Sequence, residues 1–230
     1  MANILLIGGN SGIGLATAKS LQAAGHNLFA ASRSQDQLQT LGIPVQDFDA
    51  STPTKLELPE ALDGLAYFPG TINLKPFHRL TTEDFQADYQ INALATVNIL
   101  QQTLPHLKKS PSASVLLFST IAVQTGMPFH ASIAMAKGAL EGLTRSLAAE
   151  WAPKIRVNAI APSLTDTPLA SPLLNNETKR QSAADRHPLK RVATAQEIAN
   201  LASYLLSDQS APLTGQILHP DNGLSSLKLF

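Results

Sequence analysis

The 230-residue chain contains no cysteine. This absence excludes disulfide bonds, thiolate metal sites and cysteine nucleophiles, and it fits a reducing compartment such as the cytoplasm. The chain also has no excess charge of either sign, because Lys plus Arg and Asp plus Glu both total 17. We therefore expect a small-molecule partner, and neither nucleic acid nor an anionic membrane surface.

Long hydrophobic runs are absent as well. No apolar stretch reaches the roughly 18 residues that suggest a transmembrane helix. The first apolar run, residues 4–7, lacks the cationic lead of an export signal. The sequence therefore predicts a protein that is neither exported by such a signal nor membrane-spanning.

Short apolar runs alternate with longer segments of helical period. Such alternation is typical of a parallel sheet with helices on both faces, so we expect one doubly wound, Rossmann-like α/β domain over residues 1–230. Segment 165–191 is rich in Pro and Leu, and we expect it to be a lid over the open edge of the sheet. The predicted strands are 4–7, 28–31, 45–48, 65–68, 115–118, 155–160 and 216–218, and the predicted helices are 12–24, 82–108, 129–151 and 195–206.

A glycine-rich turn follows the first predicted strand. It runs from Gly8 through Asn10 and Ser11 to Gly12-Ile13-Gly14, where a helix begins. Glycines let the backbone approach an anion closely, and the unpaired N–H groups of a helix start favour negative charge. The turn therefore predicts a site for the pyrophosphate of a dinucleotide.

The end of the second strand indicates which dinucleotide. An acidic residue there would hold the ribose hydroxyls of NAD(H), but the chain reads Ser32-Arg33-Ser34. A guanidinium between two hydroxyls suits the 2′-phosphate of NADP(H). We expect NADP(H) to be preferred and NAD(H) to remain possible, with a plain surface arginine as the alternative interpretation.

Further motifs, in the same order along the chain, resemble the short-chain dehydrogenase/reductase family. They are Asp49 after the third strand, Asn92 in a helix, the segment 136–150 around Lys137, the strand and loop 155–168, and the final 213–223 segment. The resemblance implies hydride transfer between a nicotinamide and a carbonyl, and a homotetramer or dimer. It also implies that Lys137 holds the nicotinamide ribose, that Asn92 anchors a water, and that Thr120 or Ser119 orients the substrate oxygen.

Two departures from the family pattern bear on function. The family's catalytic tyrosine, four residues before the lysine, aligns with Ile133, which has no proton to give. His130 lies on the same helical stripe as Ile133 and Lys137, so it is a candidate replacement donor, with a bystander or helix-capping role as the alternative. The family's Asn-Asn-Ala-Gly segment aligns with residues 67–70, and its polar contacts to the sheet are expected to be lost.

These arguments give a defined set of expected site residues. The expected catalytic residues are Asn92, Ser119, Thr120, His130 and Lys137. The expected cofactor contacts are Gly8, Asn10, Ser11, Gly12, Ile13, Gly14, Ser32, Arg33, Ser34, Asp49, Ala50, Pro69, Gly70, Lys137, Pro162, Leu164 and Thr167.

Three functions fit the sequence. The first is an NADP(H)-dependent oxidoreductase acting on a carbonyl or conjugated enoyl substrate through an atypical site. The second is a catalytically silent NADP(H)-binding protein that acts as a sensor or partner subunit. The third, nucleic-acid binding through a Rossmann-like face, has only the fold to support it and no basic excess.

Overall fold

A seven-stranded sheet forms the centre of the computed structural model, which describes residues 1–52 and 54–228. The strand order is β3-β2-β1-β4-β5-β6-β9, and all neighbouring strands are parallel. The predicted doubly wound α/β fold is confirmed. The strands are β1 (Asn3–Ile7), β2 (Asn27–Ser32), β3 (Val45–Asp47), β4 (Gly64–Tyr67), β5 (Ala113–Phe118), β6 (Ile155–Ile160) and β9 (Ile217–Leu218).

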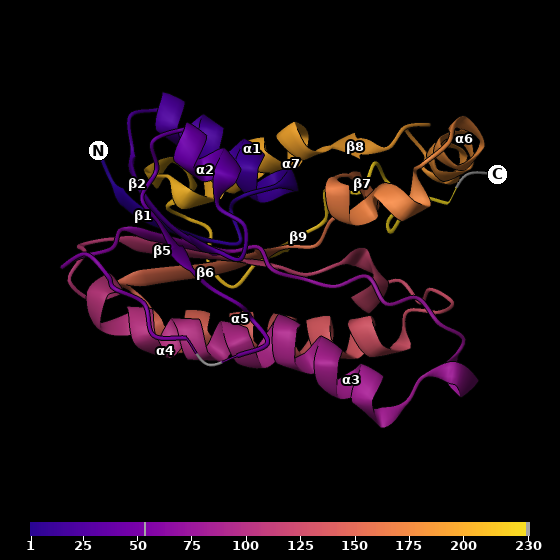
Figure 1. Cartoon of the computed structure of the whole chain (residues 1–230), viewed down its shortest axis with the longest axis horizontal. Coiled ribbons are helices and arrows are strands. Elements are labelled where there is room, and N and C mark those ends of the chain that lie inside the picture. Colours follow the sequence, from indigo (N-terminus) through magenta and orange to yellow (C-terminus); the bar gives the residue numbers. More distant parts are fainter. Residues whose placement is uncertain (53, 229–230) are drawn as a thin grey trace.

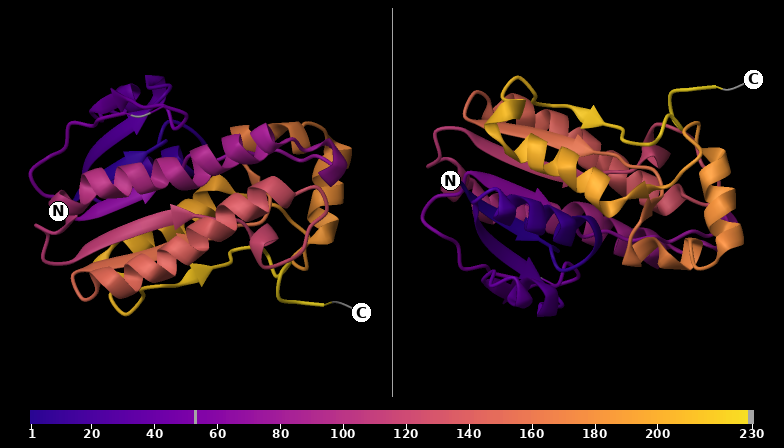
Figure 2. Two further views of the ribbon diagram at one scale, coloured as in Figure 1. Left: turned by 90° about the horizontal axis from the view of Figure 1, so that it is seen from below. Right: turned by 90° about the horizontal axis from the view of Figure 1, so that it is seen from above.

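Helices cover both faces of this sheet (Figure 1). One layer holds α1 (Gly12–Ala23), α2 (Asp36–Thr40) and α7 (Ala195–Leu206), and the other holds α3 (Thr82–Tyr89), α4 (Ala95–Leu107) and α5 (Ala131–Trp151). The views from below and above show the two layers in turn (Figure 2).

The two helix layers explain why the strands are apolar without alternation. Along β1, Ile4 and Leu6 belong to one core cluster, whereas Leu5 and Ile7 belong to the other. All four side chains are fully buried. A strand covered on both faces has no solvent side, so each of its positions favours an apolar residue.

The predicted helix 82–108 is interrupted. Between α3 and α4 the chain forms one π-helical turn, η2 (Gln90–Leu94). The Tyr67 hydroxyl donates a 2.7 Å hydrogen bond to the Ile91 carbonyl in this turn. Residues 67–70 thus keep one side-chain polar contact, which joins the end of β4 to the π turn and not to the sheet.

Segment 165–191 lies beyond the carboxyl ends of the strands (Figure 1). It contains β7 (Thr165–Asp166), the 3₁₀ segment η4 (Pro168–Leu173) and helix α6 (Glu177–Arg186), and β7 pairs with β8 (Ala193–Thr194). Within the part of the chain described, no helix is long and apolar enough to cross a lipid bilayer.

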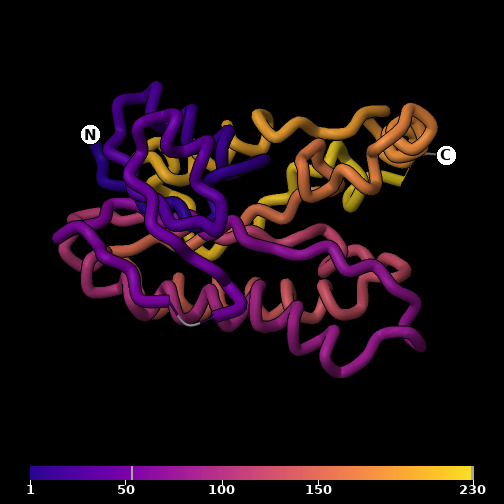
Figure 3. The backbone as a smooth tube through the Cα atoms, in the orientation of Figure 1, coloured from indigo at the N-terminus to yellow at the C-terminus, as the bar shows by residue number. Residues whose placement is uncertain are grey.

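Residues 70–76, here called the arm, leave the end of β4 on an extended path towards the short helix η1 (Phe77–Arg79) (Figure 3). The arm is bonded to its surroundings at several points. Lys75 Nζ lies 2.6 Å from Asp84 Oδ1 on α3, and the Lys75 backbone N–H donates to the Phe129 carbonyl at 3.2 Å. The arm thus follows α3 closely on its way out from the sheet.

Candidate cofactor and active-site cleft

A cleft of about 630 Å³ opens at the carboxyl edge of the main sheet. It lies where the strand order reverses between β1 and β4, which is where ligands bind in open α/β sheets. The lining comes from the ends of β1 to β5, from the arm, from α3 and η2, and from the start of segment 165–191. The lining residues are Gly8, Ser11, Gly12, Ile13, Gly14, Ser32, Arg33, Ser34, Phe48, Asp49, Ala50, Phe68, Pro69, Gly70, Thr71, Ile72, Asn73, Asp88, Ile91, Phe118, Thr167, Pro168 and Leu169.

The glycine turn forms one end of the cleft. A Cβ placed on Gly14 would lie 2.8 Å from the Gly8 carbonyl oxygen, so α1 begins in direct contact with the turn. Ser11, the N-cap of α1, makes no side-chain capping bond, and the first turn of α1 holds no acidic residue. The free N–H groups at this helix start therefore face no competing negative charge, as a pyrophosphate site requires.

Asn10 has a different position from the one expected of a cofactor contact. It is 5% exposed, does not line the cleft, and its Oδ1 accepts hydrogen bonds from the backbone N–H groups of Gln37 and Leu38. Its Nδ2 donates to Ser34 Oγ and Asp36 Oδ1. Asn10 thus joins the glycine turn to the start of α2.

Arg33 stands at the far end of the cleft with its side chain exposed. Hydrogen bonds from Ser51 and, to a smaller extent, the Arg33 charge lower the pKa of Asp49. Ser32 and Ser34 line the cleft beside the guanidinium. This end of the cleft therefore offers a cation and hydroxyl groups to an anionic ligand.

Lys137 and Asn92 converge behind Gly70. Lys137 is 6% exposed, and its Nζ donates a 2.7 Å hydrogen bond to the Phe118 carbonyl. Asn92 is fully buried, and its Oδ1 has no hydrogen-bond partner among the described residues. A Cβ placed on Gly70 would lie 3.3 Å from that oxygen and 3.4 Å from Lys137 Nζ.

The grouping of Lys137 and Asn92 behind Gly70 bears on whether a dinucleotide fits the cleft. Buried polar atoms are normally bonded, so an unpartnered amide oxygen beside an ammonium indicates a position for a water or ligand hydroxyl. The position adjoins the cleft wall at Gly70, and the glycine turn lies elsewhere in the same cleft. The residues present therefore fit a dinucleotide, with the glycine turn suited to its phosphates.

The remaining expected catalytic hydroxyls are engaged within the protein. Ser119 Oγ donates a 2.7 Å bond to Glu141 Oε1, and both residues are buried. Thr120 Oγ1 accepts a bond from the Ala122 backbone N–H. Neither residue lines the cleft, and the Ser119 proton is already donated.

The two positions on the α5 stripe differ in environment. Ile133 is 5% exposed in the core. His130 is the N-cap of α5, and its Nδ1 lies 2.7 Å from the Pro128 carbonyl, to which it therefore donates. His130 does not line the cleft; nor do Pro162 and Leu164, which we expected to contact the cofactor.

Comparison with known proteins identifies the family. A family model described as Enoyl-(Acyl carrier protein) reductase matches residues 7–225. The chain belongs to the short-chain dehydrogenase/reductase family.

Full-length relatives support this membership. The chain is 33% identical to a tropinone reductase homologue of Arabidopsis thaliana (97% of this chain, 92% of the relative) and 31% identical to L-xylulose reductase of Bos taurus (95% and 94%). The solved structure of ElxO with NADP bound has the same fold, with a TM-score of 0.87 at 24% identity and coverage of 99% of this chain and 100% of ElxO. The homologues are oxidoreductases, which suggests that this member is an enzyme.

Sequence reasoning missed several cleft residues of this dehydrogenase/reductase domain. The rings of Phe68 and Phe118 lie 4.9 Å apart between centroids, tilted by 34°, and both residues line the cleft. Their position at strand ends is the one sequence signal that would have found them. Asp88 and Thr71 are joined by a 2.5 Å hydrogen bond. No sequence motif marks either residue, because only the path of the arm through space brings the two side chains together.

The contact between Gly14 and the turn predicts the effect of a methyl group. Gly14→Ala should weaken NADPH binding by at least about tenfold, because the Cβ would push α1 away from Gly8 and open the anion site. Gly142→Ala is the matched control, since its Cβ would enter open space. Calorimetric titration measures both variants after circular dichroism shows that they fold; unchanged affinity in Gly14→Ala would place the pyrophosphate elsewhere.

The burial of Lys137 predicts that the free energy of unfolding depends on pH. Burial lowers the pKa of Lys137 to about 7 from 10.5, although the Asp88 charge opposes the shift. Between these pH values the unfolded chain binds one more proton than the folded one, so this lysine makes stability rise with pH. Relative to Lys137→Met, the wild type should gain on the order of a few kcal/mol across this window. Denaturant unfolding of both proteins over this pH range measures the difference. An equal pH dependence of the free energy of unfolding in the two proteins would contradict the lowered pKa of Lys137.

Proposed function

We propose that the chain is an NADP(H)-dependent oxidoreductase that transfers hydride to or from a carbonyl or conjugated enoyl substrate in this cleft. The observation that supports it is the convergence of Lys137 Nζ and the unpartnered Asn92 Oδ1 behind Gly70, a residue of the wall of the cleft that also contains the glycine turn. If Lys137 had only a structural role, the buried Asn92 Oδ1 beside it would be expected to have a hydrogen-bond partner within the protein.

Each part of the cleft has a task in this proposal. The start of α1 binds the pyrophosphate, and Arg33 with Ser34 binds the 2′-phosphate. Lys137 and Asn92 bind ribose hydroxyls and water at the inner end. The reduced dinucleotide, when bound, supplies the hydride.

The names of the relatives agree with this chemistry. The proteins from Arabidopsis thaliana and Bos taurus are named for reductases, and ElxO was solved with NADP bound. The family description names an enoyl substrate. These names support a reductase of a carbonyl or enoyl group without selecting the substrate.

The proposed site is atypical at the position four residues before Lys137, where the family pattern has a tyrosine. Ile133 fills this position with a buried aliphatic side chain. General acid catalysis typically contributes roughly 10²–10⁴-fold, so reduction without a phenol needs another donor or proceeds slowly. His130 is the less suitable substitute, since it lies outside the cleft lining and donates Nδ1–H to Pro128.

Segment 165–191 is proposed to act as the lid. Thr167, Pro168 and Leu169 already line the cleft, and Leu169 remains 54% exposed, ready to contact an apolar substrate. A homotetramer or dimer, as the family implies, would cover exposed apolar side chains such as Leu94 and Met135.

A silent NADP(H)-binding protein is the second candidate. Two observations favour it: Ile133 offers no proton, and the Ser119 proton is bonded to Glu141. Such a protein would keep the anion site and the 2′-phosphate contacts while lacking turnover.

The position of Arg33 predicts the cofactor preference. NADPH should bind more tightly than NADH, and Arg33→Ala should reduce the difference, because a charge-assisted bond to phosphate contributes about 1.5–3 kcal/mol. Calorimetry with both cofactors on the wild type and Arg33→Ala decides this. Equal dissociation constants in the wild type would refute the preference.

Ile133 predicts a gain of function. Ile133→Tyr should place a phenol one helical turn before Lys137 and raise NADPH-dependent ketone reduction, towards the roughly 10²–10⁴-fold that a general acid supplies. His130→Ala should leave activity unchanged if the histidine is a bystander. The absorbance of NADPH reports both, against ketones, quinones and enoyl thioesters.

Three outcomes separate the candidates. Activity in the wild type that His130→Ala removes would make the histidine the donor. Activity that appears only in Ile133→Tyr would mean that the natural chain has lost its donor. Silence of all three proteins, each with cofactor bound, supports the binding protein.

A further inference from the structure

A buried acid, Asp88, lines the cleft without an assigned task. It projects from α3, whose other residues are exposed or half-buried, yet its own side chain is 3% exposed. Transfer of a carboxylate into the protein interior is unfavourable unless hydrogen bonds and an opposite charge compensate it. The groups that compensate Asp88 therefore indicate what it does.

Two residues of the arm bond the carboxyl group. Thr71 Oγ1 donates to Asp88 Oδ1 at 2.5 Å, and Asn73 Nδ2 donates to Asp88 Oδ2 at 3.4 Å. Both partners are uncharged. They orient the carboxyl group but do not neutralise it.

The direction of these bonds fixes Asp88 as an acceptor. Asn92 Nδ2 donates to the Asp88 backbone carbonyl at 2.7 Å, which can only accept, so the amide nitrogen is on this side. The same nitrogen donates to Thr71 Oγ1 at 3.0 Å. The single Thr71 proton is then free to go to Asp88 Oδ1, which accepts it.

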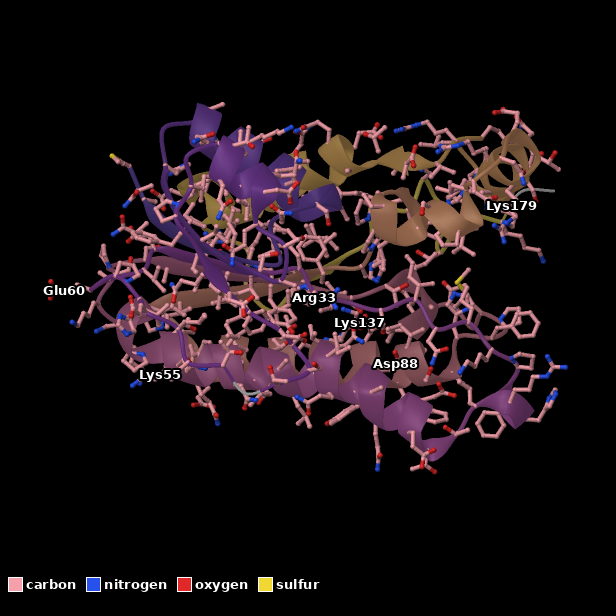
Figure 4. The ribbon with its side chains drawn as sticks, in the orientation of Figure 1. Arg33, Lys55, Glu60, Asp88, Lys137 and Lys179 are labelled. Carbon is pink, nitrogen blue, oxygen red and sulfur yellow. The ribbon has the colours of Figure 1, made fainter. Side chains whose placement is uncertain are left out.

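The compensating charge is Lys137. A Cβ on Gly70 would lie 3.4 Å from Lys137 Nζ, and the next residue, Thr71, donates to Asp88 Oδ1, so the arm brings the two groups to the same end of the sheet (Figure 4). In agreement, the Asp88 charge raises the pKa of Lys137 against the larger, opposite effect of burial. The other nearby acids are occupied. Glu141, one turn along α5, is bonded by Ser119 and pairs with Arg145, and Asp84 pairs with Lys75.

Lys137 has capacity to act on a ligand. Its ammonium has three N–H bonds, of which one goes to Phe118 and the others find no acceptor among the described residues. They adjoin Gly70, a residue of the cleft wall. Whether this nitrogen carries a proton at neutral pH then decides what the inner end of the cleft can donate.

We propose that Asp88 is a positioning residue of this site: its carboxylate holds the proton on Lys137 at neutral pH. This inference rests on the proposed function for its use in catalysis. There, an N–H bond of Lys137 breaks, an O–H bond forms on the product oxygen, and the neutral amine regains a proton from water. A reduced dinucleotide, when bound, would supply the hydride and with it the electron pair.

Lysine NMR tests the proposal without turnover. In protein labelled with ¹³C and ¹⁵N lysine, the Lys137 signal is assigned by its loss in Lys137→Met, and its pH titration is recorded in the wild type and Asp88→Asn. Asparagine keeps the shape and the acceptor for Thr71 but removes the charge. The titration midpoint should fall by about 1–3 pH units, the effect of removing an opposite charge nearby.

Glu83→Gln is the matched control, because it removes one negative charge from an exposed position of the same helix. Its Lys137 midpoint should equal that of the wild type. An equal midpoint in Asp88→Asn as well would overturn the proposal. If Asp88→Asn does not fold, the double variant Asp88→Val/Thr71→Val removes donor and acceptor together, and the same fall is expected.

The pH profile of turnover separates this proposal from the proposed function. In an active protein, the alkaline limit of kcat/KM should move down with the Lys137 midpoint in Asp88→Asn. A fall in the NMR midpoint with a fixed alkaline limit would overturn the role of Lys137 as donor. Failure of the wild type to turn over any substrate contradicts the proposed function, while the NMR titration still decides the role of Asp88.

Discussion

The parallel direction of all seven strands in the main sheet is the constraint on which the cleft depends. Parallel strands need crossover helices, so both faces of the sheet are covered and only its edges are open to a ligand. The carboxyl ends of β1 to β5 then meet at one edge, where the order reverses. The glycine turn, Arg33, Asp49 and Gly70 are separated in the chain but share one cleft for this reason.

Much of the fold could be predicted because its signals are local. The apolar run at β1 and the helical period of α5 depend only on burial by neighbouring layers. The π turn and α6 could not be predicted in this way. The π turn is stabilised by Tyr67 from a distant strand, and α6 is strongly polar, with only Ala183 buried, so no apolar stripe marks it.

In the candidate site too, the features that depend on local sequence could be predicted and the others could not. Glycines before a helix have a local mechanical meaning, and the turn lies in the cleft. The contacts of Asn10 could not be predicted from the sequence, because a polar residue in a glycine turn can face either a ligand or the neighbouring loop, and here it bonds the start of α2. Asp88 was missed because its helix reads as a solvent-exposed polar helix until the arm covers it.

The arm has one more consequence, for how affinity is obtained. Thr71 and Asn73 are bonded to Asp88, and Lys75 to Asp84 and to the Phe129 carbonyl, so this wall of the cleft is ordered before any ligand arrives. A flexible wall would lose conformational freedom when it closed on a ligand, and that loss would weaken binding. With the arm preorganised on α3, a ligand that contacts Gly70 or Ile72 keeps the full free energy of those contacts. Selectivity at this wall then comes from the fixed shape of the arm.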